Sequence, residues 1–263
     1  MFETHVATKQ DFEAIDQVLT FLKRKELDFI FKNRRLLENT ELVTYDSKYT
    51  YVVQQNGAST KTEHGIQLSK TDRLGWRASV SIPEIRQKLS NNKNYISGPI
   101  QTIFIKSHQQ RGNGSIYTTP ESYMATIIHE FGHVYYENIK SSWFSNYDYN
   151  IKLMNLAKDL YNGKNVDLEN FEIKLPQHLI ESETFAFCTE YSAAKYFWPE
   201  YKKQLDISGL ETIERYLNKE ITDKLINEES VLDETHMGAS VIGKILMEKL
   251  GDTWVDFILD KKA

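Results

Sequence analysis

Residues 119–138 of the chain read TPESYMATIIHEFGHVYYEN, and this stretch determines the architecture that we expect. Thr119 can cap a helix, Pro120 suits the first helical position, and the acidic Glu121 is favourable in the first turn. Apolar side chains within residues 127–134 recur at helical spacing. The pattern therefore predicts one buried helix that begins at the Thr-Pro pair.

The middle of this helix contains the run His129-Glu130-Phe131-Gly132-His133, an H-E-x-x-H pattern. Because four residues make about one helical turn, the two imidazoles share a face and can bind one metal ion. Glu130 lies beside that face and can act on the reacting water rather than bind the metal. The pattern indicates a catalytic Zn²⁺ site, which takes three protein ligands and one water.

The third ligand separates the classes of zinc site. In metzincins it is a histidine that follows a glycine, but this chain has Tyr136 and Ile139 at those two positions. A carboxylate from the later run Glu181-Ser182-Glu183-Thr184-Phe185-Ala186 is the alternative. Glu181 and Glu183 are two residues apart on an expected helix, so they point to different faces and only one of them can bind.

The run Glu183-Thr184-Phe185-Ala186 resembles the E-x-x-A pattern of gluzincins, a group of zinc metallopeptidases. In that group the glutamate binds zinc and the alanine leaves room where two helices cross. The segment is also similar to that of anthrax lethal factor and related bacterial metallopeptidases, about fifty residues after H-E-x-x-H. The resemblance covers about residues 102–197 and implies that His129, His133 and Glu183 bind zinc, with Glu181 as the rival ligand.

Two further roles are implied by the resemblance. Several gluzincins orient a zinc histidine with an acidic residue four positions after the glutamate, but this chain has Phe187 there, so Glu190 or a backbone carbonyl is expected to serve instead. Gluzincins also stabilise the oxyanion from the C-terminal lobe. Residues 235–238, Thr-His-Met-Gly, resemble the Tyr-containing pattern of that lobe, one residue short in spacing. His236, expected at a helix start, is therefore the candidate, and His178 is the alternative.

The remaining patterns predict an α+β fold. Short β-branched or aromatic runs predict strands over 49–53, 65–68, 78–82, 102–106 and 115–118, the last two forming a hairpin. Helical spacing predicts helices over 12–22, 149–161, 179–197, 210–227, 235–250 and 254–259. The resemblance implies a zincin-like arrangement with an N-terminal helical segment (1–48), a lobe of mixed sheet with the zinc helix (49–140), and a helical lobe with the third ligand (141–263).

Composition limits the partners. A net charge of -5 over 263 residues gives no electrostatic case for binding nucleic acid, and no apolar run approaches the length of a membrane span. Cys188 is the only cysteine, so the chain has no disulfide within it. Met1 to Ile15 lacks the apolar core of a signal peptide, which favours a cytoplasmic location. The oligomeric state is left open.

The sequence thus predicts a zinc peptidase that acts on a peptide or protein, with Glu130 as the general base. Two other classes stay open. One is a regulatory or binding protein of the zincin fold without general proteolysis, against which Glu130 weighs, because a structural zinc site does not need it. The other is an effector or toxin protease of narrow specificity, which the resemblance to lethal factor suggests.

Overall fold

The computed structural model describes residues 9–45, 49–54, 59–63, 101–106, 119–140, 179–206 and 231–259. The chain divides into two compact units, Met1–Lys23 with Asn33–Ile127 and Arg24–Lys32 with Ile128–Ala263. The division falls inside helix α3 (Pro120–Ile139), so the H-E-x-x-H run belongs to the second unit. The lobe boundaries expected at residues 48 and 140 stay a prediction.

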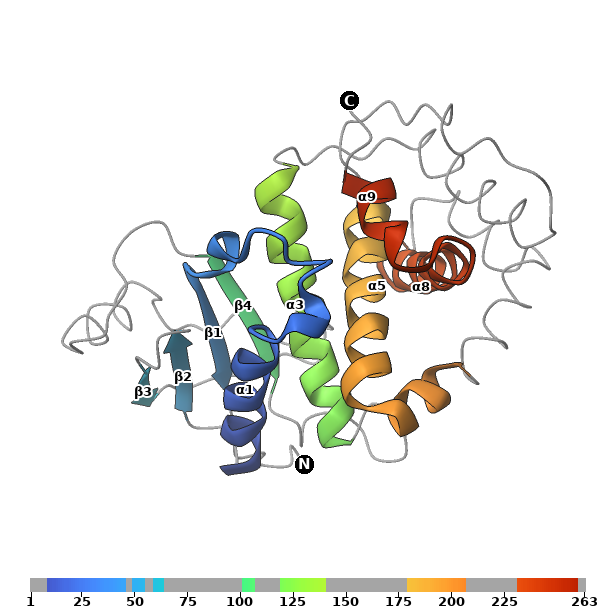
Figure 1. Cartoon of the computed structure of the whole chain (residues 1–263). Coiled ribbons are helices and arrows are strands. Elements are labelled where there is room, and N and C mark those ends of the chain that lie inside the picture. Colours follow the sequence, from blue (N-terminus) through green and yellow to red (C-terminus); the bar gives the residue numbers. More distant parts are fainter. Residues whose placement is uncertain are drawn as a thin grey trace. The chain divides into compact units, whose positions relative to one another are not determined.

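The first unit contains a mixed sheet of four strands in the order β3-β2-β1-β4 (Figure 1). The strands are β1 (Thr40–Tyr45), β2 (Tyr49–Gln54), β3 (Ser59–Glu63) and β4 (Gln101–Lys106). β2 pairs antiparallel with both β1 and β3, whereas β4 runs parallel to β1. The predicted strands over 49–53 and 102–106 are confirmed. Those over 65–68, 78–82 and 115–118, and with them the hairpin, lie outside the described residues.

Strand β1 was not predicted, and its burial explains why. Thr40, Glu41 and Leu42 are consecutive residues and all three are buried, so the strand begins without the alternation that marks a half-exposed strand. Glu41 and Gln54 are register partners on β1 and β2 and are both 0% exposed. A carboxylate inside the sheet does not resemble a core position in the sequence.

The first unit also contains helix α1 (Lys9–Phe21) and a short 3-10 helix, η2 (Arg34–Leu37). The segment between them, Arg24–Lys32, belongs to the second unit. Most of the apolar positions that predicted helix α1 are buried, among them Ile15 and Val18. The ring of Phe12 packs edge-on against that of Tyr51 on β2, at 4.9 Å between centroids. The predicted amphipathic helix is therefore confirmed.

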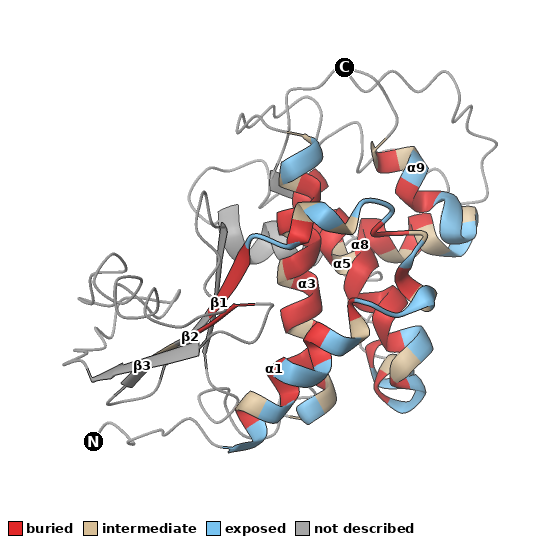
Figure 2. Cartoon of the chain, turned by 60° about the vertical axis from the view of Figure 1, so that its left-hand side comes forward, coloured by how far each residue is buried: buried red, intermediate tan, exposed pale blue. Residues whose placement is uncertain are grey.

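The second unit is helical in its described part. It contains the 3-10 helix η1 (Lys25–Leu27), the later part of α3, α5 (Leu179–Phe197), a helix over 199–206, α8 (Val231–Leu250), η6 (Gly251–Thr253) and α9 (Trp254–Leu259). Buried residues, red in Figure 2, run along α5 and α8. The ring of Phe185 packs against Trp254 at 5.2 Å and against Tyr136 at 5.6 Å. Phe185 lies on α5, the helix that also carries the expected third ligand.

The helix ends of the second unit follow local rules. α5 ends at Phe197 as predicted, and Pro199 then occupies the first position of the helix over 199–206. The backbone N–H of Lys202 donates to the Trp198 carbonyl at 2.9 Å across this break. α9 has the predicted bounds, and Gly251, with φ of +55°, follows α8 in the left-handed conformation that glycine adopts readily. The helices expected over 149–161 and 210–227 lie outside the described residues.

No helix in the described ranges is both long and apolar enough to cross a membrane.

Candidate metal centre

The start of α3 is capped as the sequence predicted. The Thr119 hydroxyl accepts the backbone N–H of Ser122 at 3.2 Å, and Pro120 is the first helical residue. The helix continues without interruption to Ile139, so His129 and His133 lie one turn apart on its surface. Their ring centroids are 4.9 Å apart.

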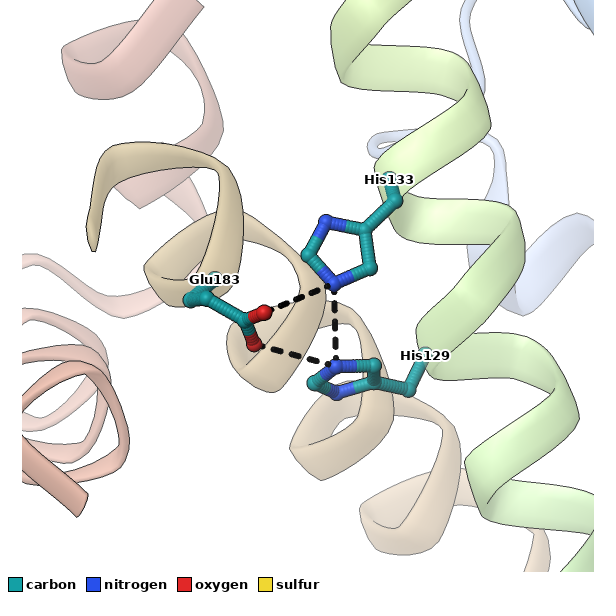
Figure 3. Close-up of side chains that lie close together, drawn as sticks. All are labelled: His129, His133 and Glu183. Atoms are coloured by element: carbon teal, nitrogen blue, oxygen red, sulfur yellow. Dashed lines mark hydrogen bonds and ion pairs between the residues drawn. The ribbon is translucent and has the colours of Figure 1, made fainter. Parts of the chain in front are cut away.

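A close helix crossing places the third candidate ligand. A Cβ atom added at Gly132 of α3 would lie 2.9 Å from the Ala186 Cα of α5 and 3.2 Å from the Thr189 side chain. The two backbones therefore approach so closely that position 132 has room only for glycine. Ala186, which the resemblance implied at such a crossing, is found there, and Glu183 one turn earlier on α5 faces the two histidines (Figure 3).

The three side chains converge on one point. Nε2 of His129 and Nε2 of His133 are 3.2 Å apart, and the Glu183 carboxylate oxygens lie 3.4 Å from the first and 3.5 Å from the second (Figure 3). Ligands at about 2.0–2.1 Å from a tetrahedral ion are about 3.3–3.4 Å from one another. The distances from the two nitrogens to the carboxylate, each to a different oxygen, are compatible with a shared metal ion such as Zn²⁺, for which two imidazoles and a carboxylate are a usual ligand set.

Within the part of the chain that the structure describes, this is the one group of three such side chains close enough to share an ion. Glu181 is not a member. It is 2% exposed, and its carboxylate lies 4.0 Å from the Lys140 ammonium at the end of α3. Glu181 and Glu183 therefore face different partners, as expected for residues two apart on a helix.

The outward nitrogens of the two rings face polar side chains of α5. Nδ1 of His133 is 2.7 Å from the Ser182 hydroxyl, and Nδ1 of His129 is 3.3 Å from the Glu190 carboxylate. When the hydrogen of a neutral imidazole is on Nδ1, the Nε2 lone pair is available to bind a metal ion. The expectation that Glu190 replaces the residue at position 187 is confirmed as a contact. The ring of Phe187 instead packs edge-on against His129 at 4.7 Å.

Charge and burial are balanced within the metal-free group. Burial lowers the pKa of His129, but the carboxylates of Glu183 and Glu190 outweigh this and raise it to about 10. Burial likewise raises the pKa of Glu183, but the two histidines outweigh it and hold this pKa well below its ordinary value. Without a metal, a proton on His129 therefore compensates the buried carboxylates, and a cation can take its place.

The two proposed catalytic residues are not among the three ligand candidates. Glu130 is partly exposed on α3. The placement of His236 at a helix start was wrong, because α8 begins at Val231 and includes Asp233 and Glu234 in its early turns, where acidic side chains favour a helix. His236 is thus inside α8, its side chain is not described, and its role stays a prediction. His178 lies outside the described residues.

Two neighbours of the site were missed by sequence reasoning. Ser182 could have been found, because it immediately precedes the candidate ligand and so lies on the adjacent side of the same helix. Tyr201, whose hydroxyl donates to the second oxygen of Glu190 at 3.2 Å, could not, because it comes from the helix beyond Pro199. Its proximity depends on how the chain turns there.

Comparisons with known protein families, with curated proteins and with solved structures find no match to this chain. The interpretation of the centre therefore depends on its own geometry and chemistry.

Proposed function

We propose that this chain is a zinc-dependent peptidase of the gluzincin type, with an α+β, zincin-like fold. The observation that carries the proposal is the convergence of His129, His133 and Glu183: the two Nε2 atoms are 3.2 Å apart, and each lies 3.4 or 3.5 Å from one of the two Glu183 carboxylate oxygens. Structural zinc sites usually have four protein ligands. This group, within the described residues, has three, which is the number in catalytic sites, where water or substrate completes the set.

Bound zinc would supply a Lewis acid that polarises the scissile carbonyl and lowers the pKa of water. The side chains supply the proton transfers. Glu130 is next to His129 on α3 and partly exposed, so we assign its carboxylate to accept the proton of the attacking water and to return it to the leaving amine. His236 of α8 is the proposed hydrogen-bond donor to the oxygen that becomes negatively charged.

The proposed substrate is a peptide or protein, since the amide bond is the substrate for which this combination of metal ligands and general base is suited. A metal-dependence experiment tests this. The purified chain is stripped with a chelator, reloaded with zinc, and incubated with an unfolded protein and with a peptide library. Cleavage that disappears on stripping and returns with zinc supports a general peptidase.

The same experiment distinguishes a general peptidase from the other two classes of protein. A zinc-loaded chain that cleaves neither substrate would contradict general proteolysis. It would favour a zincin-fold binding protein or a protease of narrow specificity. Addition of zinc to the stripped chain, followed by measurement of bound metal, separates this result from a failure to bind zinc.

A further inference from the structure

The carboxylate of Glu190 connects the candidate metal centre to a helix that carries none of the candidate ligands. It is 5% exposed, and its two oxygens face different partners. One lies 3.3 Å from Nδ1 of His129, and the other accepts the Tyr201 hydroxyl at 3.2 Å. A buried carboxylate is stable only when its oxygens have such partners. Glu190 therefore cannot turn away from Tyr201 without also changing what it offers to His129.

Tyr201 is held in place independently of the metal centre. It is 4% exposed on the helix over 199–206, which begins at Pro199 and is joined to the end of α5 through the Trp198 carbonyl. At the other end of this helix, the Lys244 ammonium from α8 donates to the Asp206 carbonyl at 2.9 Å. A lysine at this position satisfies a terminal carbonyl and complements the helix dipole. Both ends of the segment that carries Tyr201 are thus fixed.

We propose that Tyr201 and Glu190 are positioning residues for His129, so that the helix over 199–206 is part of the metal centre. The inference rests on the proposed function, because the histidine that it concerns is a proposed zinc ligand. The Tyr201 hydroxyl fixes the orientation of the Glu190 carboxylate. The carboxylate, 3.3 Å from Nδ1 of His129, favours the tautomer that carries its hydrogen on Nδ1 and so leaves the Nε2 lone pair for the metal.

The chain offers a comparison within the same site. His133 has Ser182 as its partner at Nδ1, and that hydroxyl comes from the same helix as Glu183. His129 instead has Glu190 of α5 at Nδ1, and Glu190 is in turn held by Tyr201 of the helix over 199–206; we call this pair of contacts the relay. Tyr201 is not one of the three candidate ligands, and its hydroxyl donates to Glu190. We therefore expect its effect on zinc to pass through Glu190.

The test is a double-mutant cycle on the full chain. Zinc affinity is measured by competition with a chromophoric chelator for the wild type, Tyr201→Phe, Glu190→Gln and the double variant. Removal of an outer partner of a ligating histidine typically weakens metal binding about 10–100-fold. We expect Tyr201→Phe to weaken zinc binding about tenfold, with a loss for Glu190→Gln at least as large. The double variant should lose no more than Glu190→Gln alone, because Tyr201 acts through that carboxylate.

A control and a second readout separate positioning from general damage. Tyr196→Phe removes a hydroxyl that lies 3.4 Å from the Asp252 carboxylate on the surface, and it should leave zinc affinity unchanged. The absorption spectrum of the cobalt-loaded chain reports ligand geometry directly. This spectrum should change in Tyr201→Phe and in Glu190→Gln but not in Tyr196→Phe. A small change in the folding stability of a variant would not by itself alter the spectrum.

The outcomes are distinct. Zinc affinity in Tyr201→Phe within twofold of the wild type, with a marked loss in Glu190→Gln, would overturn the relay while leaving the metal centre intact. Losses that add in full in the double variant would overturn it as well. A wild-type chain that binds zinc but cleaves nothing would contradict the proposed peptidase activity and not the relay. A wild-type chain that binds no zinc would overturn both.

Discussion

Gly132 of α3 and Ala186 of α5 touch at a point where a Cβ at position 132 would come within 2.9 Å of the Ala186 Cα. Both residues lie within one turn of a candidate ligand, Gly132 next to His133 and Ala186 three residues after Glu183. The atom that a new methyl group would meet belongs to the backbone, so it cannot move aside as the end of a side chain can. The distance between the two histidines and the glutamate is therefore set by this contact.

The first prediction concerns that contact. Gly132→Ala should lower the free energy of unfolding by about 1–3 kcal/mol, as overpacking does, and should weaken zinc binding because it separates α3 from α5. Gly243→Ala is the matched control, since its new Cβ would meet the Cys188 Sγ atom at 3.1 Å and backbone atoms only at 3.5 Å or more, an ordinary contact distance. Denaturant unfolding and zinc titration of both variants measure the difference. Equal zinc affinity in Gly132→Ala and the wild type would show that the crossing does not set the site.

The second prediction concerns the two glutamates at the start of α5. Glu183→Ala should weaken zinc binding strongly, because it removes the carboxylate that lies 3.4 Å and 3.5 Å from the two histidines. Glu181→Ala should leave zinc binding unchanged, because its carboxylate faces Lys140 instead. Metal analysis after dialysis measures both. The reverse order of effects would assign the third ligand to Glu181.

The third prediction concerns protons. The pKa of His129, raised to about 10 in the metal-free chain, keeps this imidazole protonated at neutral pH, whereas the lowered pKa of Glu183 leaves it ionised. Zinc must therefore displace the proton of His129, and its affinity should rise about tenfold per pH unit near pH 7. Calorimetry in buffers with different ionisation enthalpies counts the released proton. Binding without proton release would contradict the charge state described for the metal-free group.

The fourth prediction concerns the oxyanion donor. His236→Phe should reduce turnover by about 10²–10³, the usual loss for one such donor, with zinc content and KM nearly unchanged. His178→Phe is the comparison, and it should have a much smaller effect. Steady-state kinetics on one peptide substrate measures both variants. If His236→Phe leaves turnover unchanged, His236 does not stabilise the oxyanion.

The parts of the fold and site that were predictable from sequence are the local ones. The Thr119 cap, the helix that follows it and the one-turn spacing of His129 and His133 depend only on neighbouring residues. The choice of Glu183 required a resemblance, since periodicity alone showed only that it and Glu181 face different ways. The contact between Glu190 and His129 could be expected for the same reason, as a substitute for the acidic residue absent at position 187.

The rest depends on tertiary structure. β4 pairs with β1 in parallel although a long stretch of chain separates them, and nothing in either strand specifies that partner. β1 could not be predicted because it contains Glu41, a charged residue whose burial depends on the neighbouring strand. Tyr201 reaches Glu190 only because the chain turns at Trp198 and starts a new helix. α8 begins earlier than the sequence predicts, because residues 231–234 before the expected start belong to the helix.

The most direct test of the central claim compares the wild type with Glu130→Gln for bound zinc and for turnover of the same peptide. Glu248→Gln, the same change at an exposed position of α8, is the control. The account predicts one zinc per chain in all three proteins, with turnover reduced at least about 10²-fold in Glu130→Gln alone. Turnover of Glu130→Gln within about tenfold of the wild type, a difference of about 1.4 kcal/mol in barrier height, would contradict it.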